Sequence, residues 1–171
     1  MMYREITKEM VRSWRDSILC NFDTGDIFWV NPPSNRVKIF SKAISTTSCG
    51  YMDIGINGSR FLSHRVIWAM RHNGLSASLQ IDHINCIRTD NRISNLRLAT
   101  NSQNMMNTKL RSTNSSGYKG VWFDKTNSTW VGEVWVNKKK HRVGRFSSPQ
   151  DAAMAVEKKR AELHGKFFRS E

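Results

Sequence analysis

The sequence predicts an α+β protein built from two small domains, and three observations support this fold class. Segments with the alternation of strands occur among segments with helical spacing along all 171 residues. Early strands precede a strand–turn–strand–helix unit, which predicts a ββα core in the first domain. The run 112–117 contains five Ser, Thr or Asn residues among its six, and the pattern behind it predicts a three-stranded antiparallel sheet packed on one helix. We therefore expect domains at 1–111 and 118–171, joined by a linker at 112–117.

The first domain is predicted to contain two early helices and several strands. Apolar residues recur at helical spacing over 5–19, with Thr7 as the N-cap, and again over 64–70. Ser63 is the expected cap of the second helix and Gly74 its stop. Alternation predicts strands at 27–30, 51–56 and 60–62, with Asn57-Gly58 as the turn between the last two.

The second domain has a simpler predicted order of three strands and one helix. The strands are expected at 118–123, 130–136 and 141–146, with turns at Asn127-Ser128 and Asn137-Lys138. Pro149 suits the first turn of a helix that ends before Gly165.

The charge predicts a polyanionic partner. The formal net charge is +13, with 15 Lys and Arg against 8 Asp and Glu up to Arg111 and 12 against 6 behind it. A surplus in both halves suits double-stranded DNA contacted by both domains, and a generally basic protein is the alternative on charge alone.

Targeting signals and cysteine pairs are not visible in the sequence. The first residues are too charged for a signal peptide, and no apolar run reaches the roughly 18 residues of a membrane span. We therefore expect an intracellular protein without a membrane partner, in the cytoplasm of a bacterial host if a phage encodes it. Cys20, Cys49 and Cys86 form no C-x-x-C pair, so neither a disulfide framework nor a zinc cluster is expected.

An acidic residue and a histidine follow one another at the end of a predicted strand, in the run Ile81-Asp82-His83. A carboxylate beside an imidazole can hold a hard divalent cation while the histidine remains available to take a proton. Taken alone, His83 is more often a hydrogen-bonded core histidine, and the nearby Asp90-Asn91 is more often a turn. Their combination with the segment that follows favours a catalytic site.

That segment begins a helix with a further oxygen ligand. Thr100 and Gln103 form a capping box. Asn104 would lie on the second turn of the helix, where its amide oxygen can bind a hard cation. A strand–turn–strand–helix arrangement would bring Asp82 and Asn104 to one metal ion, with His83 beside it.

The series I-D-H-I-N, D-N-R, N-L-R and T-x-x-x-N within residues 81–104 resembles the HNH nuclease motif of small phage and intron-encoded homing endonucleases. The likeness extends over about residues 15–108, because the segments 22–29, 50–51 and 64–68 also resemble that group. It implies a ββα-metal core. It further implies Asp82 and Asn104 as metal ligands, His83 as the general base, and Asn95 as the residue that braces the loop and orients the histidine.

The resemblance implies phosphodiester hydrolysis with one divalent cation, magnesium or manganese, and no small-molecule cofactor. Arg97 would add charge near the phosphate, and a structural salt bridge is the alternative. His64 matches a recurrent family position, for which a structural role is favoured. The family usually has N-G-N where this chain has Asn85-Cys86-Ile87. This departure changes the loop but removes neither the proposed ligands nor the base.

The strand over 130–137 divides into two faces in the second domain. Trp130, Gly132, Val134 and Val136 would face the helix, and Val131, Glu133, Trp135 and Asn137 the other side. An aromatic residue on that other side, close to several basic side chains, suits a sheet that lies in a DNA groove. A lysine-rich hairpin that only solubilises an exposed edge is the alternative.

Residues 117–169 resemble the plant ethylene-response-factor DNA-binding domain, through Gly117-Tyr118-Lys119-Gly120-Val121, Val143-Gly144-Arg145-Phe146 and the Ala-rich helix. Such domains read the major groove with the sheet, mostly through Arg and Trp, and also occur behind HNH cores. The matching positions here are Lys119, Trp122, Glu133, Trp135, Lys140 and Arg142. Several arginines of the family are replaced, so the resemblance implies the binding mode and not the target sequence.

The sequence as a whole favours a homing-type, metal-dependent DNA endonuclease with a separate C-terminal recognition domain. The alternative is a non-catalytic DNA-binding regulator that retains the nuclease scaffold. A third reading treats the first domain as a structural ββα fold that binds no metal. The presence of Asp82, His83 and Asn104 together argues against both alternatives.

Overall fold

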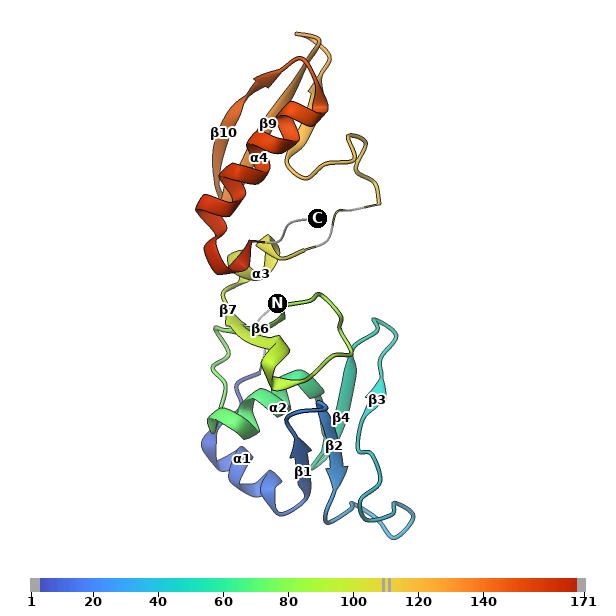
Figure 1. Cartoon of the computed structure of the whole chain (residues 1–171). Helices are drawn as coiled ribbons and strands as arrows, with labels where there is room; N and C mark the ends of the chain where they lie inside the picture. The colour runs from blue at the N-terminus through green and yellow to red at the C-terminus, as the bar shows by residue number, and fades with distance from the viewer. Residues whose placement is uncertain (1–3, 109, 111, 169–171) are drawn as a thin grey trace. The chain divides into compact units, whose positions relative to one another are not determined.

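The chain is described by a computed structural model that covers residues 4–108, 110 and 112–168. It divides into two compact units, Met1–Thr100 and Asn101–Glu171, called unit 1 and unit 2. Figure 1 shows both, and each is described by itself below. Within the described ranges, no helix combines the length and the apolar character that a membrane crossing requires.

Unit 1 consists of short antiparallel sheets and two helices around one core. Its elements are α1 (Lys8–Arg15), β1 (Ile18–Asn21), β2 (Asp26–Trp29), β3 (Ser45–Thr46), β4 (Met52–Ile56), β5 (Ser59–Leu62), α2 (Ser63–His72), β6 (Gln80–His83), η1 (Ile93–Asn95) and β7 (Leu96–Ala99). β1 pairs with β2, β4 lies between β3 and β5, and β6 pairs with β7, all antiparallel.

The first helix confirms its cap but ends earlier than the sequence predicts. Thr7 is the N-cap, and its Oγ1 accepts a hydrogen bond from Met10 N at 3.3 Å. The prediction of a helix over 5–19 is wrong at its end, because Ile18 starts β1. Trp14 and Ile18 are both 2% exposed. They enter the same core from two different elements, so their spacing of four imitates one helical face.

The second helix differs from the prediction at both caps. It begins at Ser63, with Leu62 as the N-cap, so Ser63 is its first residue and not its cap. It ends at Asn73, which takes the left-handed conformation at φ 60° that Gly74 was expected to supply. The Asn57-Gly58 turn before it is confirmed, since both residues have positive φ, as a two-residue hairpin of strands requires.

Unit 2 contains a three-stranded antiparallel sheet covered on one face by a helix (Figure 1). Its elements are α3 (Asn101–Met106), β8 (Val121–Asp124), β9 (Thr129–Val136), β10 (Lys139–Phe146), α4 (Pro149–His164) and η2 (Gly165–Phe167). β9 is the central strand. Ser148 caps α4 by accepting a hydrogen bond from Asp151 N at 3.1 Å.

The helix-facing side of β9 packs as the alternation predicts. Val134 is buried with Ala152 and Val156 of α4 in the core of unit 2. Gly132 is required at this contact, because a Cβ atom on it would lie 2.7 Å from Val156 Cγ2. The helix can therefore approach the sheet closely only over a residue without a side chain.

The predicted linker lies within the contact-based limits of unit 2, close to β8. Ser116 Oγ donates a hydrogen bond to Val121 O at 2.7 Å, and Gly117 N donates one to Asn114 Oδ1 at 2.7 Å. Both bonds hold this segment in a turn next to the sheet. Arg111, at which the first predicted domain ends, lies outside the described residues, and the domain limits at 111 and 118 remain predictions.

Candidate active site and nucleic-acid interface

The β6–β7 hairpin carries the acidic residue and the histidine of the motif. Asp82 is 5% exposed and His83 6% exposed, at the end of β6. In the antiparallel register Asp82 lies opposite Arg97, and His83 lies opposite Leu96. Because neighbouring residues of a strand point to opposite faces, the carboxylate and the imidazole occupy different sides of the hairpin.

Arg97 forms the salt bridge that the sequence left as an alternative. Its Nε donates to Asp82 Oδ2 at 2.7 Å, and its Nη2 lies 2.7 Å from the same oxygen. Both side chains are largely buried, at 15% and 6% exposed. A buried carboxylate needs such a partner, since its charge loses the solvation of water. Arg97 therefore fixes the direction of the Asp82 carboxylate.

Asn95 braces the loop that joins the two strands of the hairpin. Its Oδ1 accepts from Asn85 N at 3.0 Å, and its Nδ2 donates to Asn85 Oδ1 at 3.0 Å and to Asp90 O at 2.8 Å. The loop is closed further by Asp90, which takes a bidentate pair of hydrogen bonds from Arg92 at 2.8 and 2.6 Å. The bonds from Arg92, followed by the one from Asn85, lower the pKa of Asp90 to about 2.

The departure at Asn85-Cys86-Ile87 leaves the turn intact. Cys86 takes the left-handed conformation at φ 57°, which glycine adopts most easily, and its amide donates to His83 O at 2.9 Å. Asn85 Oδ1 accepts from Ile87 N at 2.9 Å, which supports the same turn. A non-glycine residue there costs about 1 kcal/mol of backbone strain.

Asn91 orients the imidazole of His83, a role that the sequence resemblance placed on Asn95. His83 Nε2 lies 3.0 Å from Asn91 Oδ1, and the Asn91 Nδ2 donates to Met52 Sδ at 3.7 Å. An amide oxygen only accepts hydrogen bonds, so Nε2 carries the proton and Nδ1 has the lone pair. This contact engages Nε2, so Asn91 fixes the orientation of the ring through that nitrogen. The only sequence signal for Asn91 was its place in the Asp90-Asn91-Arg92 run.

His64 of α2 packs against His83 inside unit 1. The two ring centroids lie 4.9 Å apart with an interplanar angle of 74°, and Tyr51 lies 5.4 Å from His64. His64 is 5% exposed, and its Nδ1 is buried without a hydrogen-bond partner. Burial lowers the pKa of His64 to about 3, with smaller effects from the charges of His83 and Arg65. His64 is thus a neutral ring that limits the movement of His83, in keeping with the favoured structural role.

The β1–β2 hairpin contacts the loop that joins β6 to β7. Ile93 N donates to Phe22 O at 2.9 Å. Gly25, at φ 74°, lies so close to the loop that a Cβ atom on it would be 2.4 Å from the carbonyl carbon of Asn91. The turn of the β1–β2 hairpin therefore packs directly on the backbone of the loop that carries Asn91.

The two proposed metal ligands belong to different units. Asp82 lies in unit 1, and Asn104 lies on α3 of unit 2, where its carbonyl oxygen accepts from Asn107 N at 3.2 Å. Their convergence on one cation remains a prediction. A carboxylate and an amide oxygen are both hard ligands and suit Mg²⁺ or Mn²⁺. Among the residues that the structure describes, no three His, Cys, Asp or Glu side chains gather into a metal-binding group.

The face of the β8–β10 sheet away from α4 carries most of the predicted DNA contacts. The strand register places nine side chains on this outer face, namely Trp122, Asp124, Thr129, Val131, Glu133, Trp135, Lys140, Arg142 and Arg145. Trp122 is 43% and Trp135 55% exposed. Two large aromatic rings exposed beside three basic side chains form a surface suited to a nucleic acid.

Charge pairs order the basic side chains of the outer face. Lys140 Nζ lies 3.2 Å from Glu133 Oε2 and 5.4 Å from the centre of the Trp135 ring. The Trp135 indole Nε1 donates to Glu133 Oε1 at 3.3 Å. Glu133 therefore holds a lysine and a tryptophan together on the outer face.

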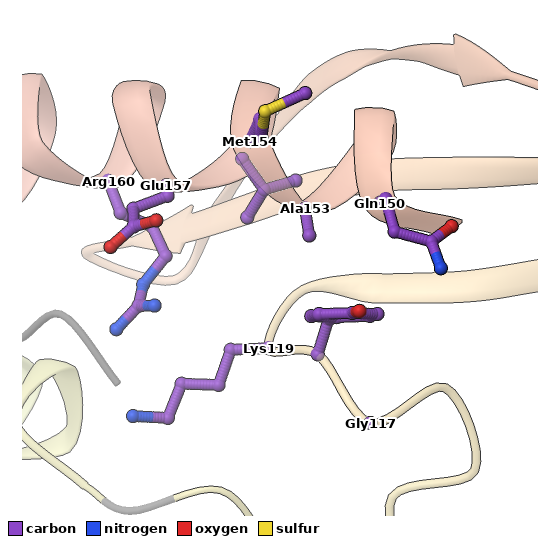
Figure 2. Close-up of a pocket in the computed structure, with 9 residues that line it drawn as sticks. Gly117, Lys119, Gln150, Ala153, Met154, Glu157 and Arg160 are labelled. Carbon is purple, nitrogen blue, oxygen red and sulfur yellow. The ribbon is translucent and has the colours of Figure 1, made fainter. Parts of the chain in front are cut away.

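Lys119 lies on the helix side of unit 2, apart from the other five predicted contacts. Figure 2 shows it below α4, in a pocket of about 410 Å³ that Arg160 and Glu157 also line. Its Nζ donates to the backbone oxygen of Thr108. The structure thus brings Trp122, Glu133, Trp135, Lys140 and Arg142 onto one face and leaves Lys119 on the other.

Comparison with known proteins gives one family and one solved structure. Residues 61–106 match the family model described as HNH endonuclease. The matched residues, called the HNH segment below, contain both His64 and His83. No curated protein matches. The chain is similar to a structure titled "DNA binding and cleavage by the HNH homing endonuclease I-HmuI", at 20% identity and a TM-score of 0.43, over 60% of this chain and 56% of that one.

We expect Gly25→Ala to destabilise unit 1 by about 1–3 kcal/mol more than Gly58→Ala. Both glycines have a positive φ, of 74° and 72°, so alanine introduces similar backbone strain at each. Only Gly25 meets neighbouring backbone atoms, whereas nothing lies within 4 Å of a Cβ atom on Gly58. Urea unfolding of the two variants measures the difference, and equal free energies of unfolding would contradict the close packing against the loop.

The pKa of His64 makes the stability of the protein depend on pH. The unfolded chain takes up a proton near pH 6.5 and the folded chain only near pH 3. The free energy of unfolding therefore falls as the pH is lowered through this window, by about 1.4 kcal/mol per pH unit. His64→Gln removes this contribution. Urea unfolding between pH 6.5 and 4 should show a shallower decline for the variant, and parallel curves there would refute the buried neutral state.

Proposed function

We propose that this chain is a metal-dependent, homing-type endonuclease that hydrolyses phosphodiester bonds in double-stranded DNA. The observation that carries the proposal is the hydrogen bond that fixes the His83 ring, at 3.0 Å from the buried Asn91 amide, within the HNH segment. A ring whose Nε2 is held as a donor presents the lone pair of Nδ1 for base catalysis. Because a core histidine can be hydrogen-bonded in the same way, the match of residues 61–106 to the HNH endonuclease model is what favours a catalytic role.

The proposed reaction is direct attack of water on phosphorus. His83 Nδ1 takes a proton from the water molecule, and the resulting hydroxide forms a bond to phosphorus. The bond from phosphorus to the 3′-oxygen breaks, and solvent protonates the leaving oxygen. Asn91 accepts from Nε2 before and after the proton transfer, the ring then releases the proton to solvent, and Asn95 keeps the loop that carries Asn91 closed.

Asp82 and Asn104 are the residues that we propose to hold a magnesium or manganese ion. When bound, the cation supplies positive charge that stabilises the developing charge on the phosphate and on the leaving oxygen. Arg97 directs the Asp82 carboxylate through its two contacts with Oδ2, at 2.7 Å each. This places a guanidinium in the same polar cluster, where it also favours an anionic substrate.

The outer face of unit 2 is proposed to provide the affinity and register for DNA. In this reading unit 2 acts as the separate recognition domain, similar to the plant ethylene-response-factor domain, with its sheet in the major groove. Trp122 and Trp135 are exposed for contact with bases or sugars. Arg142 would contact phosphates, and Lys140 and Arg145 would exchange their carboxylate partners Glu133 and Asp124 for phosphates. Linkage of two DNA-binding units in one chain raises the effective concentration of the second contact.

Cleavage by the wild-type chain and not by His83→Ala or Asp82→Ala is the expected result with plasmid DNA and Mg²⁺ or Mn²⁺. Loss of a base or of a metal ligand should lower the rate by at least about 100-fold. Both variants should keep DNA binding in a gel-shift assay, because the proposed phosphate contacts lie elsewhere. Wild-type protein that binds DNA but never cuts it would favour a non-catalytic regulator, and equal cleavage by His83→Ala would refute the assigned base.

The double variant Lys140→Ala, Arg142→Ala should bind DNA more weakly and with less dependence on salt. Each lost phosphate contact lowers the slope of log Kd against log salt by about 0.9. The matched control is Lys158→Ala, Lys159→Ala, which removes the same charge from α4 on the other face of the sheet. Fluorescence titrations at several salt concentrations measure both slopes. A larger effect of the control pair would show that the helix side faces the DNA.

A further inference from the structure

The loop between β2 and β3 of unit 1 is basic and ends in an apolar tip. No Asp or Glu occurs from residue 27 to residue 52, whereas Arg36, Lys38 and Lys42 all lie in this stretch. Lys42 is paired with Asp26 at 2.9 Å. At the tip, Ile39 is 60% and Phe40 67% exposed. Phe40 is the most exposed of the described large apolar residues, and only Met154, at 65%, lies between the two. Two adjacent apolar side chains are therefore presented to a partner.

Phe40 occupies a backbone position that normally belongs to glycine. Ser41 N donates to Lys38 O at 3.1 Å, which makes residues 38–41 a tight turn, and Phe40 is its third residue with φ 59°. A turn of this kind selects Gly or Asn at the third position, because a side chain on a left-handed residue is sterically unfavourable. An aromatic residue in this position is strained, and no burial within unit 1 compensates for it. Such conflicts are typical of binding sites.

The tip is held firmly to the core of unit 1. Phe40 N donates to Trp29 O at 2.7 Å, Trp29 N donates to Ser41 O at 3.1 Å, and Ala43 N donates to Ile27 O at 2.8 Å. Ile27 and Trp29 are buried at 0% and 8% exposed. The turn therefore projects two apolar side chains from a fixed base, and binding through them costs little ordering of the chain.

We propose that Ile39 and Phe40 form an apolar wedge that inserts at a base step of duplex DNA, with Arg36 and Lys38 on the adjoining phosphates. An exposed apolar pair that directly follows two basic side chains, Arg36 and Lys38, is complementary to unstacked bases beside a phosphate backbone. The inference rests on the proposed nuclease function and adds a second contact to it. In Figure 1 the loop lies at the end of unit 1 away from the β6–β7 hairpin, so the wedge contacts DNA that flanks the cleaved position.

The test uses the full-length chain and a duplex on which its cut position has been mapped, with 2-aminopurine placed at successive positions on both sides. Without divalent cation, wild-type protein should raise the fluorescence at one step, because the wedge unstacks the base there. Phe40→Gly should abolish this signal and raise Kd about tenfold. This variant suits the turn at φ 59° better than phenylalanine does, so it should fold with at least wild-type stability.

Leu19→Ala is the matched control, because Leu19 is 54% exposed on β1 of the same unit and lies between Asp16 and Asp23 in sequence. It should keep the fluorescence signal, the affinity and the cleavage rate. Wild-type binding and cleavage with no fluorescence change at any position, together with an unchanged Kd for Phe40→Gly, would overturn the wedge and leave the nuclease function standing. Binding to vesicles of anionic phospholipid that Phe40→Gly abolishes, with DNA binding unaltered, would also overturn it in favour of a membrane.

Discussion

The hydrogen bond between His83 and Asn91 is the interaction on which the candidate site depends. It joins a strand end to the middle of the following loop, and both groups are almost fully removed from solvent. An amide oxygen that cannot donate forces the proton onto Nε2, so the buried contact selects one of the two neutral forms of the ring. The chemistry assigned to His83 follows from this selection, and the rest of unit 1 can be understood as the structure that keeps Asn91 in place.

Three separate parts of unit 1 contribute to that task. Asn95 makes three hydrogen bonds within the loop that joins β6 to β7, and the turn at Gly25 packs directly on the backbone of this loop. His64 of α2 packs against the His83 ring. Gly25, His64 and Asn95 are all more than 20 residues apart in sequence. Strands that precede the motif therefore contribute to the structure around His83. The β6–β7 hairpin alone is too short to bury Asp82 and His83, so the surrounding elements are needed to shield both side chains from water.

The packing of unit 2 depends on one glycine, at the contact between its helix and its sheet. Gly132 lets α4 approach the sheet, and this close contact commits one face of β9 to the core. The opposite face of the sheet carries two exposed tryptophans, Trp122 of β8 and Trp135 of β9. Glu133 and Lys140 occupy it together with Trp135, so part of its positive charge is balanced within the protein. For the proposed contact with DNA, this arrangement would favour recognition by shape and stacking over attraction by charge alone.

The sequence by itself determined the Thr7 cap, the Asn57-Gly58 turn and the two faces of β9, because each depends on residues close together in the chain. It also placed Asp82 and His83 at a strand end. Only the tertiary structure decided that Asn91 orients His83, that Ile18 leaves the first helix for a strand, and that Lys119 lies on the helix side of unit 2. These outcomes depend on which distant segments pack together, and local spacing carries no record of that packing.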